Sequence, residues 1–166
     1  MNKLVLTAAA ALIAAQLYAQ PATPQATFSK DAGTLSDKFS GLARVMAGKY
    51  EWKPGEGVRS VGDVLNLIVS ENALLIITVS GSPAGPRPAP IADPAKLQEA
   101  ITTSYANLQK AISGLSDSDL QTSVKLFGRD MTKQSALTLL LADQHEHLGQ
   151  SIAYARMNGV VPPWSK

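Results

Sequence analysis

The side chains best suited to hold a metal ion lie in one short run of the sequence. The run from Asp143 to His147 contains both histidines of the chain together with two acidic residues. Successive residues of a helix are about 100° apart, which places Asp143 and His147 on one face, about 40° from each other. His145 is rotated by about 200° from His147, so both histidines cannot face one ion.

Three interpretations of Asp143 and His147 are open. They can form a structural pair one helical turn apart, worth about 0.3–0.5 kcal/mol when exposed. They can also ligate a divalent ion, and then a further ligand must come from elsewhere, because zinc takes three or four protein ligands. The third interpretation is proton transfer by His147. We expect His145 and Glu146 to form a solvated face.

Composition excludes several other kinds of chemistry. The 166 residues include no cysteine, which excludes disulfides, thiolate zinc sites and cysteine nucleophiles. The 15 basic and 13 acidic residues give a formal charge of +2, far from the excess that nucleic-acid binding needs. The sequence contains neither a Gly-x-Ser-x-Gly nucleophile motif nor a glycine-rich phosphate loop.

Residues 1–19 have the pattern of a secretory signal peptide. Lys3 precedes an apolar stretch from Leu4 to Ala15, and Ala19 is a small residue at the expected cleavage point. The stretch is shorter than the ~20 residues of a membrane-spanning helix. We expect export to the periplasm or beyond the cell, with no stable membrane insertion after cleavage. Residues 20–29 are expected to form a linker before a folded domain over residues 30–166.

Four amphipathic helical segments are predicted after the linker. Apolar residues recur in each at spacings of three and four, as on the buried face of a bundle helix. The segments cover about 28–48, 61–79, 94–114 and 133–157. Between the second and third, Ser80 to Pro90 contains four prolines, which exclude a helix. The expected fold class is all-α, a four-helix bundle with a long crossover between helices two and three.

Two features refine this outline. Ser60 and Asp63 form a capping box at the start of the second segment, and Thr132 is the expected N-cap of the fourth. Residues 116–131 show no helical period, and only 124–127 are expected to be extended. The second segment is apolar around nearly its whole circumference, which predicts burial on more than one side and hence a homodimer.

Two parts of the chain resemble the DinB-like superfamily. One lies around the start of the second segment, and the more specific one covers the end of the chain. They are Tyr50-Glu51-Trp52-Lys53-Pro54, Gly57-Val58-Arg59-Ser60-Val61-Gly62-Asp63-Val64-Leu65 and Glu71-Asn72, then Glu146-His147-Leu148-Gly149-Gln150 and Tyr154-Ala155-Arg156-Met157-Asn158-Gly159-Val160-Val161-Pro162-Pro163-Trp164-Ser165. With the first helix and the order of the loops, the similarity covers about residues 30–166.

This resemblance implies a four-helix bundle, often dimeric, and a metal centre. Many members hold nickel or zinc through three histidines, one on the second helix and two spaced four apart on the last, and some transfer thiol cofactors onto electrophiles. By position, His147 matches the last histidine, Asp143 matches the first of the spaced pair, and Leu67 matches the histidine of the second helix. Because leucine cannot coordinate a metal, the resemblance implies a broken triad.

The sequence is compatible with two functions. The leading hypothesis is an exported binding or structural module that lacks the metal centre, needs no cofactor and recognises an unidentified small molecule or protein. The alternative is a transferase or hydrolase that depends on a divalent ion, zinc or nickel. In this alternative Asp143 and His147 hold the ion, and Asn72, Gln144 or water completes the shell.

Overall fold

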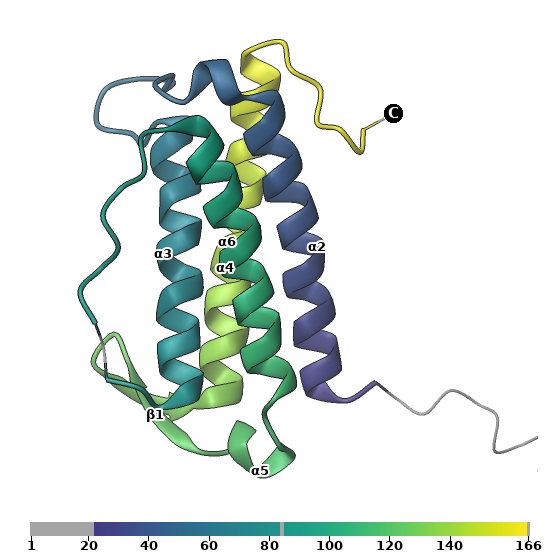
Figure 1. The fold of residues 1–166 in the computed structure, drawn as a ribbon, viewed down its shortest axis with the longest axis vertical. Coiled ribbons are helices and arrows are strands. Elements are labelled where there is room, and N and C mark those ends of the chain that lie inside the picture. The colour runs from purple at the N-terminus through teal and green to yellow at the C-terminus, as the bar shows by residue number, and fades with distance from the viewer. Residues whose placement is uncertain (1–21, 84, 166) are drawn as a thin grey trace, which may run out of the picture.

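Four long helices form a bundle in the computed structural model, which describes residues 22–83 and 85–165 (Figure 1). They are α2 (Pro24–Val45), α3 (Val61–Ser80), α4 (Pro94–Ser113) and α6 (Lys133–Met157). In Figure 1, α2 and α6 rise whereas α3 and α4 descend. Both α2 and α3 pack against α4 and α6, so α2 and α3 are diagonally opposite. The predicted all-α bundle is confirmed, and the expected signal peptide at 1–19 lies outside the described residues.

Helix α3 begins and ends where local chemistry dictates. The Ser60 hydroxyl accepts a hydrogen bond from the Asp63 amide at 3.1 Å, and the Ser60 amide donates to the Asp63 carboxylate at 2.9 Å. This confirms the predicted capping box. At the other end Gly81 takes a left-handed conformation with φ of 72°, which a residue without Cβ adopts at no steric cost.

The start of α2 differs from the sequence-based prediction. The predicted linker extends to residue 29, but the helix already begins at Pro24. Thr23 acts as N-cap, with its hydroxyl accepting from the Ala26 amide at 3.2 Å, and proline fits the first helical position because its missing N–H needs no partner there. Gln25 then donates to Asp117 at 2.9 Å, which attaches this first turn to the rest of the domain.

Replacement of Ser60 by Ala is expected to lower the free energy of unfolding by about 1 kcal/mol. The variant loses the hydroxyl that satisfies the Asp63 amide, while the helix itself remains intact. Thermal melts of Ser60→Ala and of the exposed control Ser165→Ala measure this difference. Equal melting temperatures for the two variants would contradict a stabilising role for the capping box.

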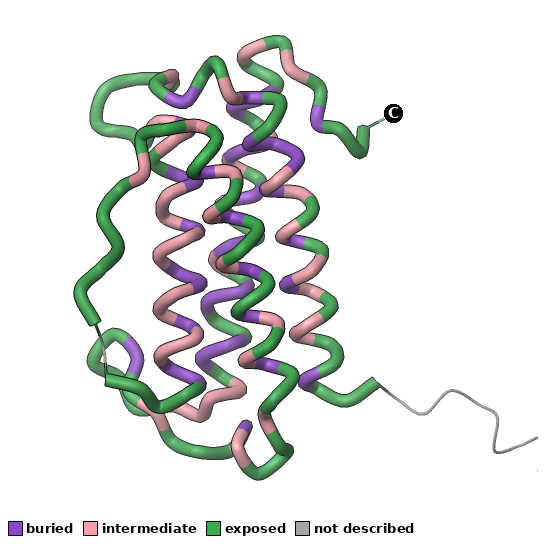
Figure 2. The backbone as a smooth tube through the Cα atoms, viewed as in Figure 1, coloured by how far each residue is buried: buried purple, intermediate pink, exposed green. Residues whose placement is uncertain are grey.

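The core runs along the bundle axis, with buried residues on the inward faces of the four helices (Figure 2). Phe39 of α2 and Tyr105 of α4 stack near its middle, with ring centroids 6.4 Å apart. Of the described helices, α3 is the one long and apolar enough to cross a membrane by length and composition. In the bundle, some of these apolar residues belong to the core, where Ile68 and Leu75 are fully buried, and others, such as Leu74, are half-buried on the outer side of the helix.

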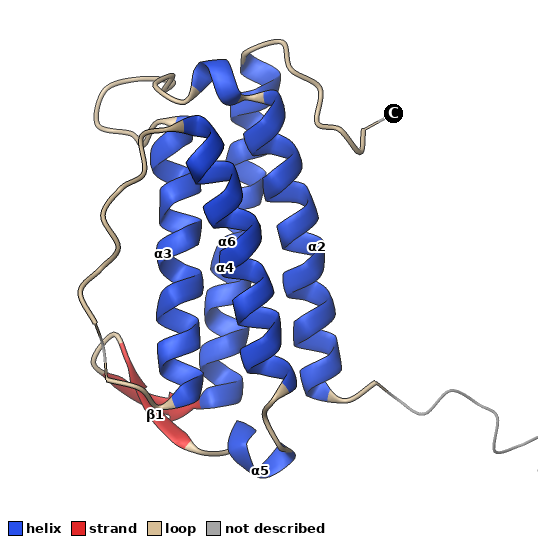
Figure 3. Cartoon of the chain, in the orientation of Figure 1, coloured by secondary structure: helices blue, strands red, loops and turns tan. Residues whose placement is uncertain are grey.

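A small hairpin and a single helical turn connect α4 to α6 (Figure 3). The turn is α5 (Asp117–Leu120), and strands β1 (Ser123–Leu126) and β2 (Arg129–Thr132) pair antiparallel with Leu126 opposite Arg129. The sequence predicted only the first of these strands. One helical turn is too short to show a period, and β2 merges into the cap of α6, which explains why both were missed.

The predicted crossover is confirmed as a loop whose described residues, 81–83 and 85–93, run along the outside of the bundle (Figure 1). Its far end is attached to α3 by Asn66, which accepts from the Ile91 amide at 2.7 Å and donates to the Ile91 carbonyl at 3.1 Å. Because the loop returns over the length of the bundle, α3 and α4 run parallel, and its middle part lies against the outer side of α3.

Candidate metal centre

Three potential metal ligands meet where α3 packs against α6. His147 Nε2 lies 3.6 Å from Asp143 Oδ2 and 3.7 Å from Glu71 Oε1. All three candidate ligand atoms lie within 4.8 Å of one another. The structure thus brings Asp143 and His147 together, as their spacing predicted. It adds Glu71, whose position in the sequence does not indicate a ligand.

Two antiparallel helices position these side chains. Asp143 and His147 are one turn apart on α6, whose register is fixed by the Thr132 cap, the hydroxyl of which accepts from the Ser135 amide at 3.1 Å. Glu71 comes from the middle of α3, on the side that faces α6. The side chains of Glu71 and His147 are only 9% and 15% exposed, whereas that of Asp143 is 43% exposed. The cluster therefore opens to solvent on the side of Asp143.

A hydrogen-bonded chain along α6 orients the imidazole. Gln150 donates its amide N–H to the Tyr154 hydroxyl at 2.9 Å, which leaves the Gln150 carbonyl oxygen as an acceptor. His147 Nδ1 lies 3.1 Å from that oxygen and donates its proton to it. In this tautomer Nε2 carries the lone pair and points at the two carboxylates. Metal-binding histidines are commonly held in this way by a partner on the other ring nitrogen.

Glu71 is a buried carboxyl without adequate partners. Its Oε2 atom is fully buried and has no hydrogen-bond partner among the described residues. Burial raises the pKa of Glu71 to about 8, and the neighbouring Asp143 carboxyl adds to the increase. A buried acid beside a second acid costs free energy in the metal-free protein. Such an arrangement is explained if a cation occupies the space between the carboxylates.

The donor set fits a divalent ion. Zinc–ligand bonds of about 2.0–2.2 Å place neighbouring ligands of a tetrahedral ion about 3.3–3.6 Å apart. The two distances from His147 Nε2, 3.6 and 3.7 Å, are close to this range, and the third pair lies within 4.8 Å. Three protein ligands with one open side is the usual arrangement of catalytic rather than structural zinc.

Asn72 and Gln144, the ligands expected to complete the shell, serve a different purpose. Both are fully buried, and Gln144 donates to Asn72 Oδ1 at 2.9 Å. Gln144 Oε1 accepts from the Tyr105 hydroxyl at 2.9 Å, and Asn72 donates to the Ser104 hydroxyl at 3.0 Å. The amide oxygens are thus occupied within the core. This chain ties α3, α4 and α6 together directly behind the metal cluster, since Asn72 follows Glu71 and Gln144 follows Asp143.

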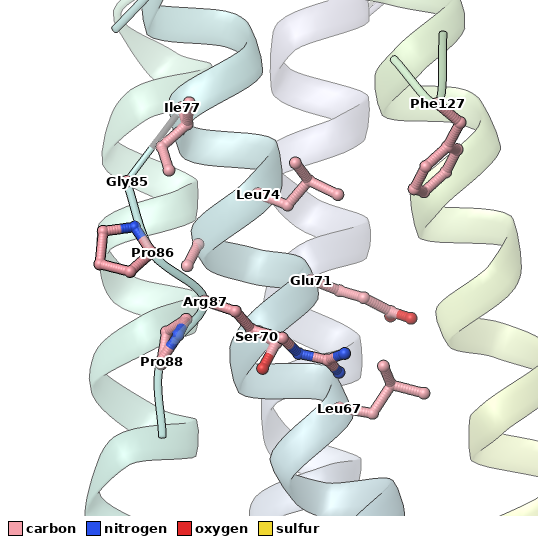
Figure 4. Close-up of a pocket in the computed structure, with 11 residues that line it drawn as sticks. Leu67, Ser70, Glu71, Leu74, Ile77, Gly85, Pro86, Arg87, Pro88 and Phe127 are labelled. Atoms are coloured by element: carbon pink, nitrogen blue, oxygen red, sulfur yellow. The ribbon is translucent and has the colours of Figure 1, made fainter. Parts of the chain in front are cut away.

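His145 and Leu67 contribute no ligand atom to the cluster. His145 points away from the cluster, and its Nε2 lies 2.9 Å from Asp31 of α2, so it is a surface pair rather than only a solvated side chain. Leu67 provides no donor. Glu71 lies one turn further along α3, and both side chains point to the same side of that helix (Figure 4). The broken triad inferred from Leu67 does not by itself exclude a metal centre, because Glu71 offers a third candidate donor.

A cavity of about 300 Å³ adjoins the cluster, and Glu71 forms part of its wall. It lies between α3, the crossover loop around Pro86 and the hairpin turn at Phe127 (Figure 4). Most of its remaining wall is apolar. The half-buried outward residues of α3, such as Leu74, are thus covered in part by the crossover loop and in part line this cavity.

The sequence matches the DinB superfamily over residues 2–151. A search of curated proteins gave no match. A DinB-like protein from Bacillus cereus has a similar crystal structure, with a TM-score of 0.72, 19% identity, and coverage of 84% of this chain and 95% of that one. For a DinB-like protein from Bacillus subtilis the TM-score is 0.66 at 19% identity, with coverage of 80% and 92%. At this identity the two structures support the fold alone.

Proposed function

The chain belongs to the DinB superfamily, and from this premise we propose that it holds one divalent metal ion through Glu71, Asp143 and His147 and uses it in a hydrolytic or group-transfer reaction. The observation that carries the proposal is the convergence of His147 Nε2 with two carboxylates beside an unpartnered buried oxygen of Glu71. A divalent ion with three protein ligands supplies Lewis acidity, which serves hydrolysis and group transfer alike.

The residues around the ion have separate tasks in this proposal. Gln150 keeps the imidazole of His147 in the tautomer that presents Nε2. Glu71 contributes a buried negative charge, and Asp143, which is half-exposed, borders the side on which the cluster opens to solvent. The hypothesis of a binding or structural module without a metal centre depends on the lack of a third metal ligand. The carboxylate of Glu71 is a candidate for that ligand, which favours the metal-dependent alternative.

The donor set favours zinc or manganese over nickel. Two carboxylates and one imidazole are harder ligands than the three imidazoles that the family resemblance implies. Divalent ions that accept mixed oxygen and nitrogen donors, zinc above all, fit such a set best. We propose zinc as the resident ion.

Removal of His147 is expected to abolish binding of one zinc ion per chain. The full chain, stripped of metal and titrated with zinc by calorimetry, is compared with His147→Ala and His145→Ala. His145 is the matched control, because it lies on the same helix but pairs with Asp31 away from the cluster. We expect the wild type and His145→Ala to bind equally, and His147→Ala to lose affinity by at least about 100-fold.

The outcomes separate the two functions. Equal zinc binding by His147→Ala and wild type, or no binding by either, would refute the metal centre. The hypothesis of a binding or structural module would then be favoured. The catalytic half of the proposal is tested with an activated ester, p-nitrophenyl acetate, whose hydrolysis should depend on added zinc in the wild type and not in His147→Ala.

Export and dimerisation are also proposals. Export is supported by the signal-peptide pattern at 1–19, and the intact mass of the secreted protein tests it, since a full-length mass in a soluble fraction would contradict cleavage. The homodimer is supported by the apolar circumference of α3, part of which is taken up by the cavity under the crossover loop. Light scattering at high protein concentration tests the homodimer, and the mass of a monomer would refute it.

A further inference from the structure

The cavity beside Glu71 has the walls of a pocket for an apolar group. Leu74 and Ile77 of α3, Pro86 of the crossover loop and Phe127 of the hairpin turn line it. Figure 4 shows Leu74 and Phe127 on the side toward which Glu71 points. The volume of about 300 Å³ is at the lower end for ligand pockets, which favours a small ligand. Because Glu71 belongs to both the cavity and the metal cluster, a ligand in this pocket lies beside one of the three candidate metal ligands.

Arg87 introduces a positive charge into this apolar setting. It lines the same cavity, and in Figure 4 its side chain leaves the crossover loop, crosses over α3 and ends between the levels of Leu67 and Glu71. It forms no ion pair with any carboxylate in the described part of the chain. A neighbouring cavity of about 490 Å³ is also lined by Arg87, together with Arg59. Asp63 lines that second cavity beside Arg59, so Arg87 is the one guanidinium group that lines the cavity of Glu71 among the described residues.

Phe127 is held over the cavity at a conformational cost. It occupies the first position of a two-residue turn with φ of 50°, followed by Gly128 with φ of 76°. Such a turn favours asparagine or glycine, and a phenylalanine in this region is strained. The residue is also 68% exposed, so it gains little from burial in the protein alone. Strain of this kind persists where a residue has a functional task, such as contact with a ligand.

The charges determine which ligand the pocket selects. A divalent ion with two ionised carboxylates and one neutral imidazole has no net charge, so the ion alone does not attract an anion. Arg87 supplies that attraction, since guanidinium binds carboxylate through charge-assisted hydrogen bonds.

We propose that the metal site acts on small amphipathic carboxylates, whose apolar part lies between Leu74, Ile77 and Phe127 and whose carboxylate pairs with Arg87. This inference rests on the proposed function, because it names the substrate class of the same site. The residues of the cavity wall that would select the substrate are not metal ligands. The substrate assignment can therefore be wrong even if the chain binds zinc as proposed.

Hexanoate and its neutral isostere hexanamide are suitable probes. Both are titrated into the zinc-loaded full chain at millimolar concentrations and followed by NMR shifts, with zinc binding measured on the same preparations. We expect hexanoate to bind about tenfold more tightly than hexanamide. Arg87→Gln should remove this preference, whereas Arg156→Gln, at the far end of α6, should retain it. Hexyl phosphate is the third probe, and tighter binding of it than of hexanoate would overturn the assignment to carboxylates.

Phe127→Asn separates folding from binding. Asparagine suits the left-handed turn, so the melting temperature should be equal to or higher than that of the wild type. Affinity for both hexanoate and hexanamide should fall about fivefold, because the apolar wall is lost.

The inference is overturned if the chain binds zinc but binds hexanoate and hexanamide equally, or if Arg87→Gln leaves the preference for hexanoate unchanged. Absence of zinc binding would instead refute the proposed function.

Discussion

Replacement of Glu71 by Gln is expected to weaken zinc binding by at least about 100-fold and, at the same time, to stabilise the metal-free protein at pH 8. The amide keeps the size of the side chain but loses its charge. It therefore removes one of three ligands and, with it, the negative charge that holds the cation. The loss of zinc affinity and the gain of stability both follow from removal of the same buried negative charge.

The stability effect follows from the protonation of Glu71. Burial raises its pKa to about 8 in the folded chain, above an ordinary value of 4.5. Between these values the folded metal-free protein keeps a proton that the unfolded chain releases. The stabilisation that this proton provides is complete below pH 4.5 and is lost as the pH rises through about 8. Glutamine stays neutral, so its contribution does not change over this window.

Chemical denaturation of the metal-free proteins at several pH values measures this effect. We expect the two proteins to be similar near pH 4.5 and Glu71→Gln to be more stable by about 1–2 kcal/mol at pH 9, after allowance for solvent screening. Glu99→Gln, an exposed acid on α4, is the matched control and should show neither effect. A Glu71→Gln protein that is less stable at pH 9, or that binds zinc like the wild type, would contradict this account of the site.

Zinc affinity should also depend on pH in the wild type. The ion binds the ionised form of Glu71, so binding must displace the proton. Affinity is therefore expected to rise as the pH approaches 8. In Glu71→Gln this part of the pH dependence disappears, which distinguishes loss of a titrating ligand from a general distortion of the cluster.

The pair on α6 could be predicted because it depends on one helix alone. Asp143 and His147 are separated by a single turn, and the limits of that helix follow from Thr132 and Asn158. No information from another element is needed to place the two side chains on one face. The bundle and its crossover were predictable for a similar reason, since prolines and caps act locally.

Glu71 could not be identified because its role depends on how two helices are aligned. One turn of helix corresponds to about 5.4 Å along its axis, and a shift of that size exchanges Leu67 for Glu71 as the residue level with His147. The sequence determines the apolar face of α3, but not its axial position against α6. That position depends on packing and on the buried chain from Asn72 through Gln144 to Tyr105. Both carboxylates of the cluster lie next to a member of this chain.

Gln144 therefore links the packing of the helices to the position of the metal ligands. Gln144→Met is expected to lower both the stability of the fold and the affinity for zinc. Methionine fills the volume but leaves the Tyr105 hydroxyl and Asn72 Oδ1 without partners in the core. Unsatisfied buried groups of this kind cost about 1–3 kcal/mol each, so the free energy of unfolding should fall by about 2–4 kcal/mol. Loss of support behind a ligand set typically lowers metal affinity by about 10–100-fold.

Denaturation and zinc titration of the same variants separate these contributions. Gln134→Met lies on α6 outside the core, where its side chain accepts only from Gln121, and should change neither quantity appreciably. Tyr105→Phe removes one bond to Gln144 and keeps the link between Gln144 and Asn72. It should lower stability but leave zinc affinity nearly unchanged, because the helices that carry Glu71 and Asp143 stay joined. If Tyr105→Phe and Gln144→Met weakened zinc binding equally, metal affinity would follow overall stability, and the link between α3 and α6 would have no specific part in positioning the ligands.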